Sequence, residues 1–223
     1  MSKYLIHACN QRMWYVNDYL IPSMLEQGID RSNIRVYLDK DNEGCLESCM
    51  KAFLSVPIDE GGVWHMQDDV IICSDFKRRT EDLDSERRIV CGFCYGQDNK
   101  KSFVGNCTPK EMWYSFPCIR IPNRIARGCA DWYYRFAKFD NNFRMWVRVK
   151  KYDDAMFNIY VQDYHSEERV LNLIPNLVEH VDDLIGGSIV NCARVENTHS
   201  ICFEEIDLVK NLEQKLKKQL TNY

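Results

Sequence analysis

Hydrophobic positions in the first part of the chain form short, continuous runs that alternate with longer amphipathic stretches. Short apolar runs bounded by polar turns are typical of buried strands, and such runs occupy residues 4–9, 34–38 and 61–73. Residues 14–27 and 45–56 instead repeat their apolar side chains with helical spacing. Strand, helix, strand, helix, strand is the order that gives parallel pairing through crossover helices. The pattern therefore predicts an α/β fold with a mixed, mostly parallel sheet flanked by helices.

The rest of the chain continues this alternation less regularly. The later elements expected, in chain order, are a charged helix at 76–88, a strand at 89–94, an extended segment at 112–121, a helix with an apolar stripe at 123–138, a helix at 155–162, short strands and turns at 170–195, and a polar terminal helix at 204–220. Asp153 and Asp154 precede one of these helices, where acidic residues suit the helix dipole. No repeat or low-complexity linker interrupts the sequence, so we expect a single domain over residues 1–223.

Asp68 and Asp69, the acid pair, stand next to each other inside the apolar run GGVWHMQDDVIIC at 61–73. Burying an ionised carboxylate is costly unless a cation or hydrogen-bond donors compensate it. Neighbouring side chains on a strand also point to opposite faces. We therefore expect the strand to end or bend at the acid pair, which would face a cavity with a cation nearby. The alternative is a turn in which both carboxylates accept hydrogen bonds from backbone amides.

Polar residues follow all three early strands. Asn10, Gln11 and Arg12 follow the first strand, Asp39 follows the second, and the acid pair interrupts the third. Ligands of open α/β sheets bind beyond the carboxyl ends of the strands, so we expect these groups to converge on one site. An arginine suits phosphate, a single carboxylate can accept from a base or ribose, and a carboxylate pair suits a hard cation such as Mg²⁺ or Mn²⁺.

Composition narrows the possible partners. The chain has 223 residues and a formal net charge of -4, which gives no general electrostatic reason to bind nucleic acid or an anionic membrane. No run approaches the ~20 apolar residues of a membrane span. One region differs, and we call it the basic stretch: Arg120, Arg124, Arg127, Arg135, Arg144, Arg148, Lys150 and Lys151. It indicates either a face for an anionic ligand or a solvated surface.

Eleven cysteines are an unusually high and odd number. The close pairs Cys45/Cys49 and Cys91/Cys94 lack the second pair or histidine that a zinc site needs. No secretory signal is recognisable at the start of the chain. We therefore expect reduced, mostly buried thiols in a cytoplasmic protein, which would be the host cytoplasm if the chain is phage-encoded.

Taken in order, five local features resemble the glycosyltransferases of the GT-A fold, over about residues 4 to 200. The first two are the opening strand and loop, Leu5 to Arg12, and the segment Val36 to Asp39. The third is Trp64 to Val70, which is similar to the Asp-X-Asp metal motif, and the fourth is Tyr152-Asp153-Asp154, which is similar to the acidic pair near the acceptor. The fifth is Pro175 to His180 followed by Gly186-Gly187-Ser188, which is similar to the late segment that brings a histidine to the metal and diphosphate.

The resemblance implies transfer of a sugar from a nucleoside-diphosphate sugar to an acceptor hydroxyl, assisted by Mn²⁺ or Mg²⁺. Residues 1–95 would form the nucleotide-sugar-binding half, and residues 96–223 the acceptor-binding half with the C-terminal helix. The implied nucleotide-sugar-binding residues are Asn10, Arg12, Asp39, Gln67 and Asp68, and the implied metal ligands are Asp69, Asp68 and His180.

Some implied roles have competitors. Gln67 stands where the metal motif usually has an acid, so Asp69 would be the main ligand. Asp182, Asp183 and His199 compete with His180 as a further ligand, whereas His65 is expected behind the site or in the core. Inverting transfer also needs a general base, for which Asp154 is the candidate and Asp153 the alternate, although Asp153 also suits a helix cap.

Two alternative functions stay open. A phage-type glycosyltransferase that modifies DNA bases would place the basic stretch along a phosphate backbone. A nucleotidyltransferase would share the metal and the nucleotide, but it normally has a glycine-rich loop after the first strand, and residues 8–13 contain no glycine. The acceptor is therefore left as a glycan, a small molecule or modified DNA.

Overall fold

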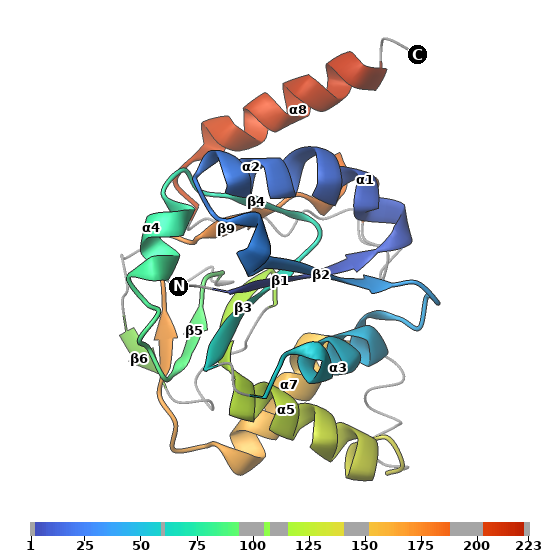
Figure 1. Ribbon diagram of the computed structural model, residues 1–223, viewed down its shortest axis with the longest axis vertical. Helices are drawn as coiled ribbons and strands as arrows, with labels where there is room; N and C mark the ends of the chain where they lie inside the picture. The colour runs from blue at the N-terminus through green and yellow to red at the C-terminus, as the bar shows by residue number, and fades with distance from the viewer. Residues whose placement is uncertain are drawn as a thin grey trace.

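A seven-stranded sheet forms the centre of the protein (Figure 1). The computed structural model describes residues 3–58, 61–93, 105–107, 116–140, 152–187 and 203–220. The strands follow the order β2-β1-β3-β7-β5-β8-β6, and their bounds are β1 Tyr4–Cys9, β2 Ile34–Asp39, β3 Gly62–Gln67, β5 Ile89–Cys91, β6 Gly105–Cys107, β7 Cys118–Pro122 and β8 Val170–Asn172.

The sheet is mixed and mostly parallel, as expected of a Rossmann-like α/β fold. β1 pairs in parallel with β2 and β3, and β5 pairs in parallel with β8. β7 lies antiparallel between β3 and β5, and β6 lies antiparallel at the edge beside β8. β1, β2, β3, β5 and β8 therefore run in one direction, and β7 and β6 in the other. The reversal at β7 is not contained in the sequence prediction, because local periodicity carries no information on which distant strand becomes a neighbour.

Helices cover both faces of the sheet (Figure 1). One layer contains α1 Met13–Tyr15, the π-helical turn η2 Val16–Leu20, α2 Ile21–Glu26, α4 Phe76–Glu81 and α8 Ile206–Leu220; the other contains α3 Cys45–Ser55, α5 Asn123–Trp132, the π-helical turn η4 Tyr133–Ala137 and α7 Asp153–Tyr164. β1 shows the alternation that produces these layers. Tyr4, Ile6 and Ala8 join the core under the first layer, whereas Leu5 joins a cluster that includes Ala52 of α3.

The chain leaves the main sheet at the acid pair. β3 ends at Gln67, and β4 (Val70–Ile72) pairs antiparallel with β9 (Val178–His180) in a separate two-stranded sheet. The expected break at Asp68 and Asp69 is confirmed. The register of β4 against β9 places His180 opposite Val70, the residue that follows the acid pair.

The structure also tests the expected length of the charged helix and the expectation that no helix spans a membrane. The helix expected at 76–88 is too long, because α4 ends at Glu81 and Arg120 donates to the carbonyl oxygens of Asp84 and Glu86 in the segment that follows. No helix among the described residues is long and apolar enough to cross a membrane.

Arginines of the basic stretch are used inside the fold. Arg120 is buried on β7, the middle strand of the sheet. Arg127 Nη1 donates to the carbonyl oxygens of Leu54 and Val56, 2.9 and 2.8 Å away, at the end of α3, and Arg124 pairs with Glu168 at 2.7 Å. Arg120 and Arg127 thus stabilise the fold, whereas Arg124 forms an ion pair on the surface. Arg144 to Lys151 lie outside the described residues.

Arg120 explains one glycine of the pair that opens β3. A Cβ at Gly62 would lie 2.8 Å from the Arg120 guanidinium, which its hydrogen bonds hold in place, whereas a Cβ at Gly61 would meet nothing within 4 Å. We expect Gly62→Ala to lower the free energy of unfolding by roughly 1–3 kcal/mol, as overpacking does. Gly61→Ala is the matched control and should change it by less than about 0.5 kcal/mol. Urea unfolding measures both, and equal effects of the two variants would contradict this explanation.

Candidate functional site

Arg12 lies between the two carboxylates of the acid pair, at the carboxyl ends of β1 and β3. Its Nη1 donates to Asp68 Oδ1 at 3.1 Å and also to Asp69 Oδ2. Its Nη2 donates to the carbonyl oxygen of Gly187 at 2.7 Å. All three charged side chains are buried, each with 6% of its surface exposed. The site therefore contains a cation next to the acid pair, as expected, and this cation is a side chain of the protein itself.

Short local elements place these groups. The 3-10 turn η1 (Asn10–Arg12) follows β1 directly and carries Arg12 towards the end of β3. The backbone amide of Cys9 donates to Asp68 Oδ2 at 2.8 Å, and the amide of Val181 donates to the carbonyl oxygen of Asp69 at 2.8 Å. Gly187 has a φ of 83°, a conformation that favours glycine. Main-chain contacts thus hold the acid pair from both sides.

His180 approaches Asp69 from β9. His180 Nε2 lies 3.1 Å from Asp69 Oδ2, and His180 Nδ1 lies 3.3 Å from Asp182 Oδ1. A histidine that ligates a metal usually has its second ring nitrogen bound to a carboxylate in this way. The other oxygen of Asp69, Oδ1, is buried and has no hydrogen-bond partner among the described residues. A buried carboxylate oxygen without a partner has the capacity to accept a cation.

The electrostatics of the pair are asymmetric. Burial opposes ionisation of Asp69, but His180 and Arg12 outweigh it and hold the pKa of Asp69 well below its usual value. Burial and the neighbouring charge of Asp69 raise the pKa of Asp68, which Arg12 and the Cys9 amide only partly offset. Burial also lowers the pKa of His180, yet Asp69 and Asp182 raise it above its usual value overall. Asp69 is therefore the firmly ionised member of the acid pair.

The expected metal ligands fit a divalent cation in part. Asp69 and His180 lie side by side, with a carboxylate orienting the histidine and an unpartnered oxygen on the aspartate. Asp68 contacts Arg12 and the Cys9 amide instead. Asp69 and His180 are thus the residues that would hold Mn²⁺ or Mg²⁺. The metal role of Asp68 stays a prediction.

The other expected nucleotide contacts lie at the same edge of the sheet. Asp39 pairs in register with Cys9, and its two oxygens accept from the amides of Glu43 and Gly44 at 3.0 and 3.1 Å. Asn10 is exposed and donates to the Lys40 carbonyl oxygen at 3.2 Å. Their roles towards a nucleotide stay predictions, as does that of Gln67 at the end of β3.

His65 lies in the core. It is 2% exposed, and His65 Nδ1 lies 3.0 Å from His7 Nε2. Burial lowers the pKa of both histidines, that of His7 to about 4. Both are therefore neutral at physiological pH, and the placement of His65 agrees with the expectation that it lies behind the site or in the core.

Asp153 and Asp154 begin α7, beside the start of α3. Asp153 is buried, its Oδ1 accepts from the Asp154 amide at 3.0 Å, and Cys45 Sγ lies 3.6 Å from it. Asp154 is half-buried and accepts from the Ala155 amide at 2.7 Å. Burial and the charge of Asp154 raise the pKa of Asp153 to about 7. The two carboxylates lie in the first turn of α7, whose N-cap is Tyr152, and each accepts from the amide of the next residue.

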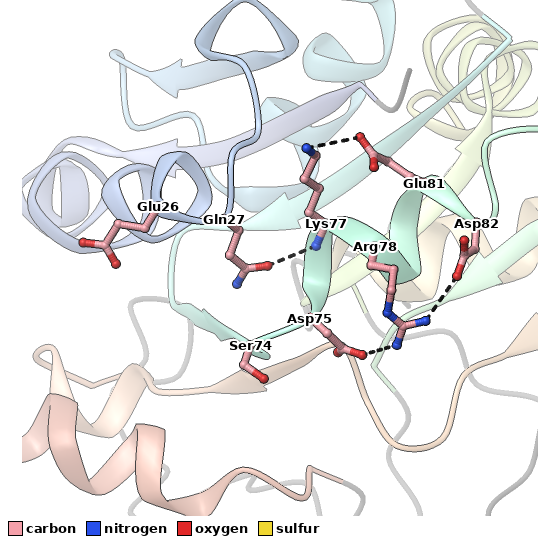
Figure 2. A pocket seen from close by; sticks show the side chains of 8 residues that line it. All are labelled: Glu26, Gln27, Ser74, Asp75, Lys77, Arg78, Glu81 and Asp82. Atoms are coloured by element: carbon pink, nitrogen blue, oxygen red, sulfur yellow. Dashed lines mark hydrogen bonds and ion pairs between the residues drawn. The ribbon is translucent and has the colours of Figure 1, made fainter.

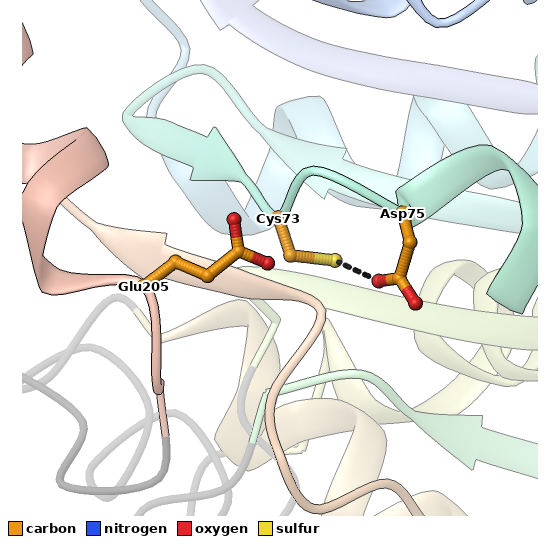
Figure 3. Close-up of side chains that lie close together, drawn as sticks. All are labelled: Cys73, Asp75 and Glu205. Carbon is orange, nitrogen blue, oxygen red and sulfur yellow. Dashed lines mark hydrogen bonds between the residues drawn. The ribbon is translucent and has the colours of Figure 1, made fainter.

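A second group of potential ligands was missed by the sequence reasoning. Cys73, Asp75 and Glu205 present ligand atoms within 4.8 Å of one another (Figure 3). Burial raises the pKa of Cys73 to about 12, so the Cys73 side chain is a neutral thiol. The amide of Ser74 donates to both oxygens of Glu205 at 3.1 and 3.0 Å. These contacts attach the segment before α8 to the β4–α4 turn, and they indicate a structural role.

A shallow depression of about 490 Å³ lies beside this group (Figure 2). It is lined by Glu26, Gln27, Ser74, Asp75, Lys77, Arg78, Glu81 and Asp82. Its basic side chains pair with its own acids: Lys77 with Glu81 at 3.9 Å, and Arg78 with Asp75 and Asp82. Gln27 donates to the Cys73 carbonyl oxygen at 2.7 Å and accepts from the Lys77 amide at 3.1 Å. The depression is therefore a polar junction between α2 and α4.

Seven cysteines are free thiols: Cys9, Cys45, Cys49, Cys73, Cys91, Cys118 and Cys129. Burial raises the pKa of six of these seven. This agrees with the expected reduced thiols. Cys94 lies outside the described residues.

Comparison with known proteins assigns no family. No protein-family model matches the chain, and no curated protein matches it. A 4-diphosphocytidyl-2C-methyl-D-erythritol synthase from Anaerococcus prevotii is similar at 11% identity and a TM-score of 0.47, over 78% of this chain and 88% of that chain. A protein from STIV is similar at 14% identity and a TM-score of 0.43, over 81% and 85%. HddC from Yersinia pseudotuberculosis is similar at 10% identity and a TM-score of 0.33, over 57% and 80%. Likenesses this distant carry no argument about function.

Asp153 gives a pH-dependent prediction. Its pKa is higher in the folded than in the unfolded protein, so the unfolded state loses this proton first as the pH rises. The contribution of Asp153 to the free energy of unfolding therefore falls between about pH 4 and pH 7. Asp153→Asn has no proton to lose. We expect its advantage in the free energy of unfolding to be smallest in acid and to reach roughly 1–4 kcal/mol above pH 7. Urea unfolding at a series of pH values measures the difference, and a difference independent of pH would contradict the assignment.

Proposed function

We propose that the protein transfers a sugar from a nucleoside-diphosphate sugar to an acceptor hydroxyl, with Mn²⁺ or Mg²⁺ as cofactor. The observation that carries the proposal is the buried group of Arg12, the acid pair and His180 at the carboxyl ends of β1 and β3. Burying charged groups is costly, and α/β proteins bind their ligands at the carboxyl ends of strands; both facts support a functional role for this site.

The chemistry of the donor set supports a diphosphate ligand. Asp69, through its unpartnered Oδ1, and His180, once Nε2 has lost its proton to solvent, would hold a divalent cation, which would neutralise negative charge on phosphate. Arg12 lies next to this position and carries the planar guanidinium that matches phosphate oxygens. The resemblance to GT-A glycosyltransferases, through the acid pair and the late histidine, supports a sugar as the transferred group.

In this reaction the bond between the anomeric carbon and the diphosphate oxygen breaks, and a bond from the acceptor oxygen to that carbon forms. Arg12 would stabilise the negative charge that develops on the departing diphosphate. The acceptor hydroxyl loses its proton to a general base. Asp154 is proposed for this role, since it is more accessible than the buried Asp153; Asp153 is the alternate.

Nucleotidyl transfer is the second candidate. The cation of Arg12 lies in the loop directly after the first strand and against the acid pair, where it would serve a triphosphate as well as a diphosphate. A DNA acceptor receives less support, because Arg120, Arg124 and Arg127 of the basic stretch make contacts within the protein.

The two candidates differ in the product they release. With Mn²⁺ present, we expect nucleoside-diphosphate sugars to yield free nucleoside diphosphate, and nucleoside triphosphates to yield no pyrophosphate. Asp69→Asn should reduce release by roughly 10²–10³-fold, a loss typical of removing one electrostatic contact to developing charge. Parallel screens for nucleoside diphosphate and pyrophosphate measure this. Pyrophosphate release alone would replace glycosyl transfer by nucleotidyl transfer, and a fully active Asp69→Asn variant would show that the acid pair is structural.

The base is tested separately. Asp154→Asn keeps the shape and helix-capping oxygen but removes the basic carboxylate, so transfer should fall by ~10²–10⁴-fold. Binding of nucleoside diphosphate, measured by calorimetry, should be unchanged. Asp163→Asn, near the other end of α7, is the control. Full transfer by both the Asp154→Asn and the Asp153→Asn variants would place the base elsewhere.

A further inference from the structure

Arg12 holds the site together through its guanidinium. One nitrogen contacts both members of the acid pair, and the other contacts the Gly187 carbonyl oxygen. These contacts join three segments that are far apart in sequence: the turn after β1, the turn after β3 and the segment after β9. In this arrangement Arg12 faces the chain's own carboxylates.

This arrangement conflicts with simultaneous metal binding. Two carboxylates that already share a buried guanidinium have little remaining attraction for a divalent cation, and the guanidinium would repel such a cation at close range. Asp69 Oδ1 nevertheless lacks a partner. Metal entry at Asp69 therefore requires either that Arg12 leaves the acid pair or that a new anion balances the added charge. A diphosphate supplies both conditions, since it brings negative charge and suits a guanidinium.

We propose that Arg12 is a resident cation which the diphosphate of the donor draws away from the acid pair, so that metal and nucleotide bind cooperatively. The inference rests on the proposed function and deepens it. Arg12 is then a positioning residue in two states: it compensates Asp68 and Asp69 before binding, and it contacts diphosphate afterwards. The transfer of one side chain couples the two ligands without a large rearrangement of the sheet.

Mn²⁺ titration tests the proposal, with free Mn²⁺ followed by electron paramagnetic resonance. ADP, CDP, GDP and UDP serve as nucleotide probes. For the parent protein we expect weak Mn²⁺ binding alone and at least roughly tenfold tighter binding with the matching nucleoside diphosphate, a size typical of gaining charge-assisted contacts. Arg12→Gln should bind Mn²⁺ alone roughly tenfold more tightly than the parent, and the enhancement by nucleotide should shrink.

Two control variants separate the effect of the specific contacts of Arg12 from the effect of its positive charge. Arg12→Lys keeps the charge but lacks the second nitrogen that contacts the Gly187 carbonyl oxygen, so its hold on the acid pair is weaker and its Mn²⁺ affinity should also rise, by less. This variant keeps the test decisive if Arg12→Gln does not fold. Arg135 is exposed on η4, and Arg135→Gln should leave Mn²⁺ binding unchanged, which controls for the loss of a positive charge in general.

The possible failures are distinguishable. Unchanged Mn²⁺ affinity in both Arg12 variants, with nucleotide and metal still binding, overturns the role of Arg12 and leaves the proposed function standing. Nucleotide binding that is identical with Mn²⁺ and with a chelator also overturns it, since Arg12 would then act as the permanent cation. Absence of both Mn²⁺ and nucleotide binding in the parent protein overturns the proposed function together with this inference.

Discussion

The buried contact between Arg12 and the acid pair is the constraint on which the rest of the structure depends. Two adjacent carboxylates inside an apolar run need a cation or hydrogen-bond donors to compensate them, and the chain supplies Arg12 from the turn after β1 together with the Cys9 amide. This contact fixes where β3 ends, because the strand gives way to the turn at Asp68 and Asp69. It also fixes where β4 and β9 lie, since His180 must reach Asp69 from the second, smaller sheet.

Much of this could be predicted from sequence, because the responsible signals are local. The apolar run that predicts the first strand coincides with β1, Tyr4–Cys9. The acid pair predicts an interruption on elementary grounds, since adjacent residues of a strand point to opposite faces. Placing Arg12, Asp39 and the acid pair at one edge follows from parallel pairing of the first three strands. Each of these features depends only on residues that are adjacent in sequence or on the pairing of the first three strands.

What could not be predicted depends on contacts between distant residues. The antiparallel insertion of β7 between β3 and β5 leaves no trace in its hydrophobic pattern. The basic stretch was compatible with an anionic ligand, but Arg120 and Arg127 serve carbonyl oxygens of other segments. Gly187 contributes a backbone oxygen to Arg12, and a carbonyl carries no residue-specific signal. Asp182 was visible only as a competing ligand, whereas the structure places it behind His180.

The central claim is that a nucleoside diphosphate and a divalent cation bind where Arg12, the acid pair and His180 meet. Paramagnetic broadening of backbone amide signals by Mn²⁺, in the presence of a nucleoside diphosphate, tests it most directly. Cys9 and Val181 donate their amides to Asp68 and Asp69, whereas Ser74 donates to Glu205 in the other group of potential ligands. We expect the amide signals of Cys9 and Val181 to disappear first while that of Ser74 persists. Loss of the Ser74 signal with Cys9 and Val181 unaffected would contradict it.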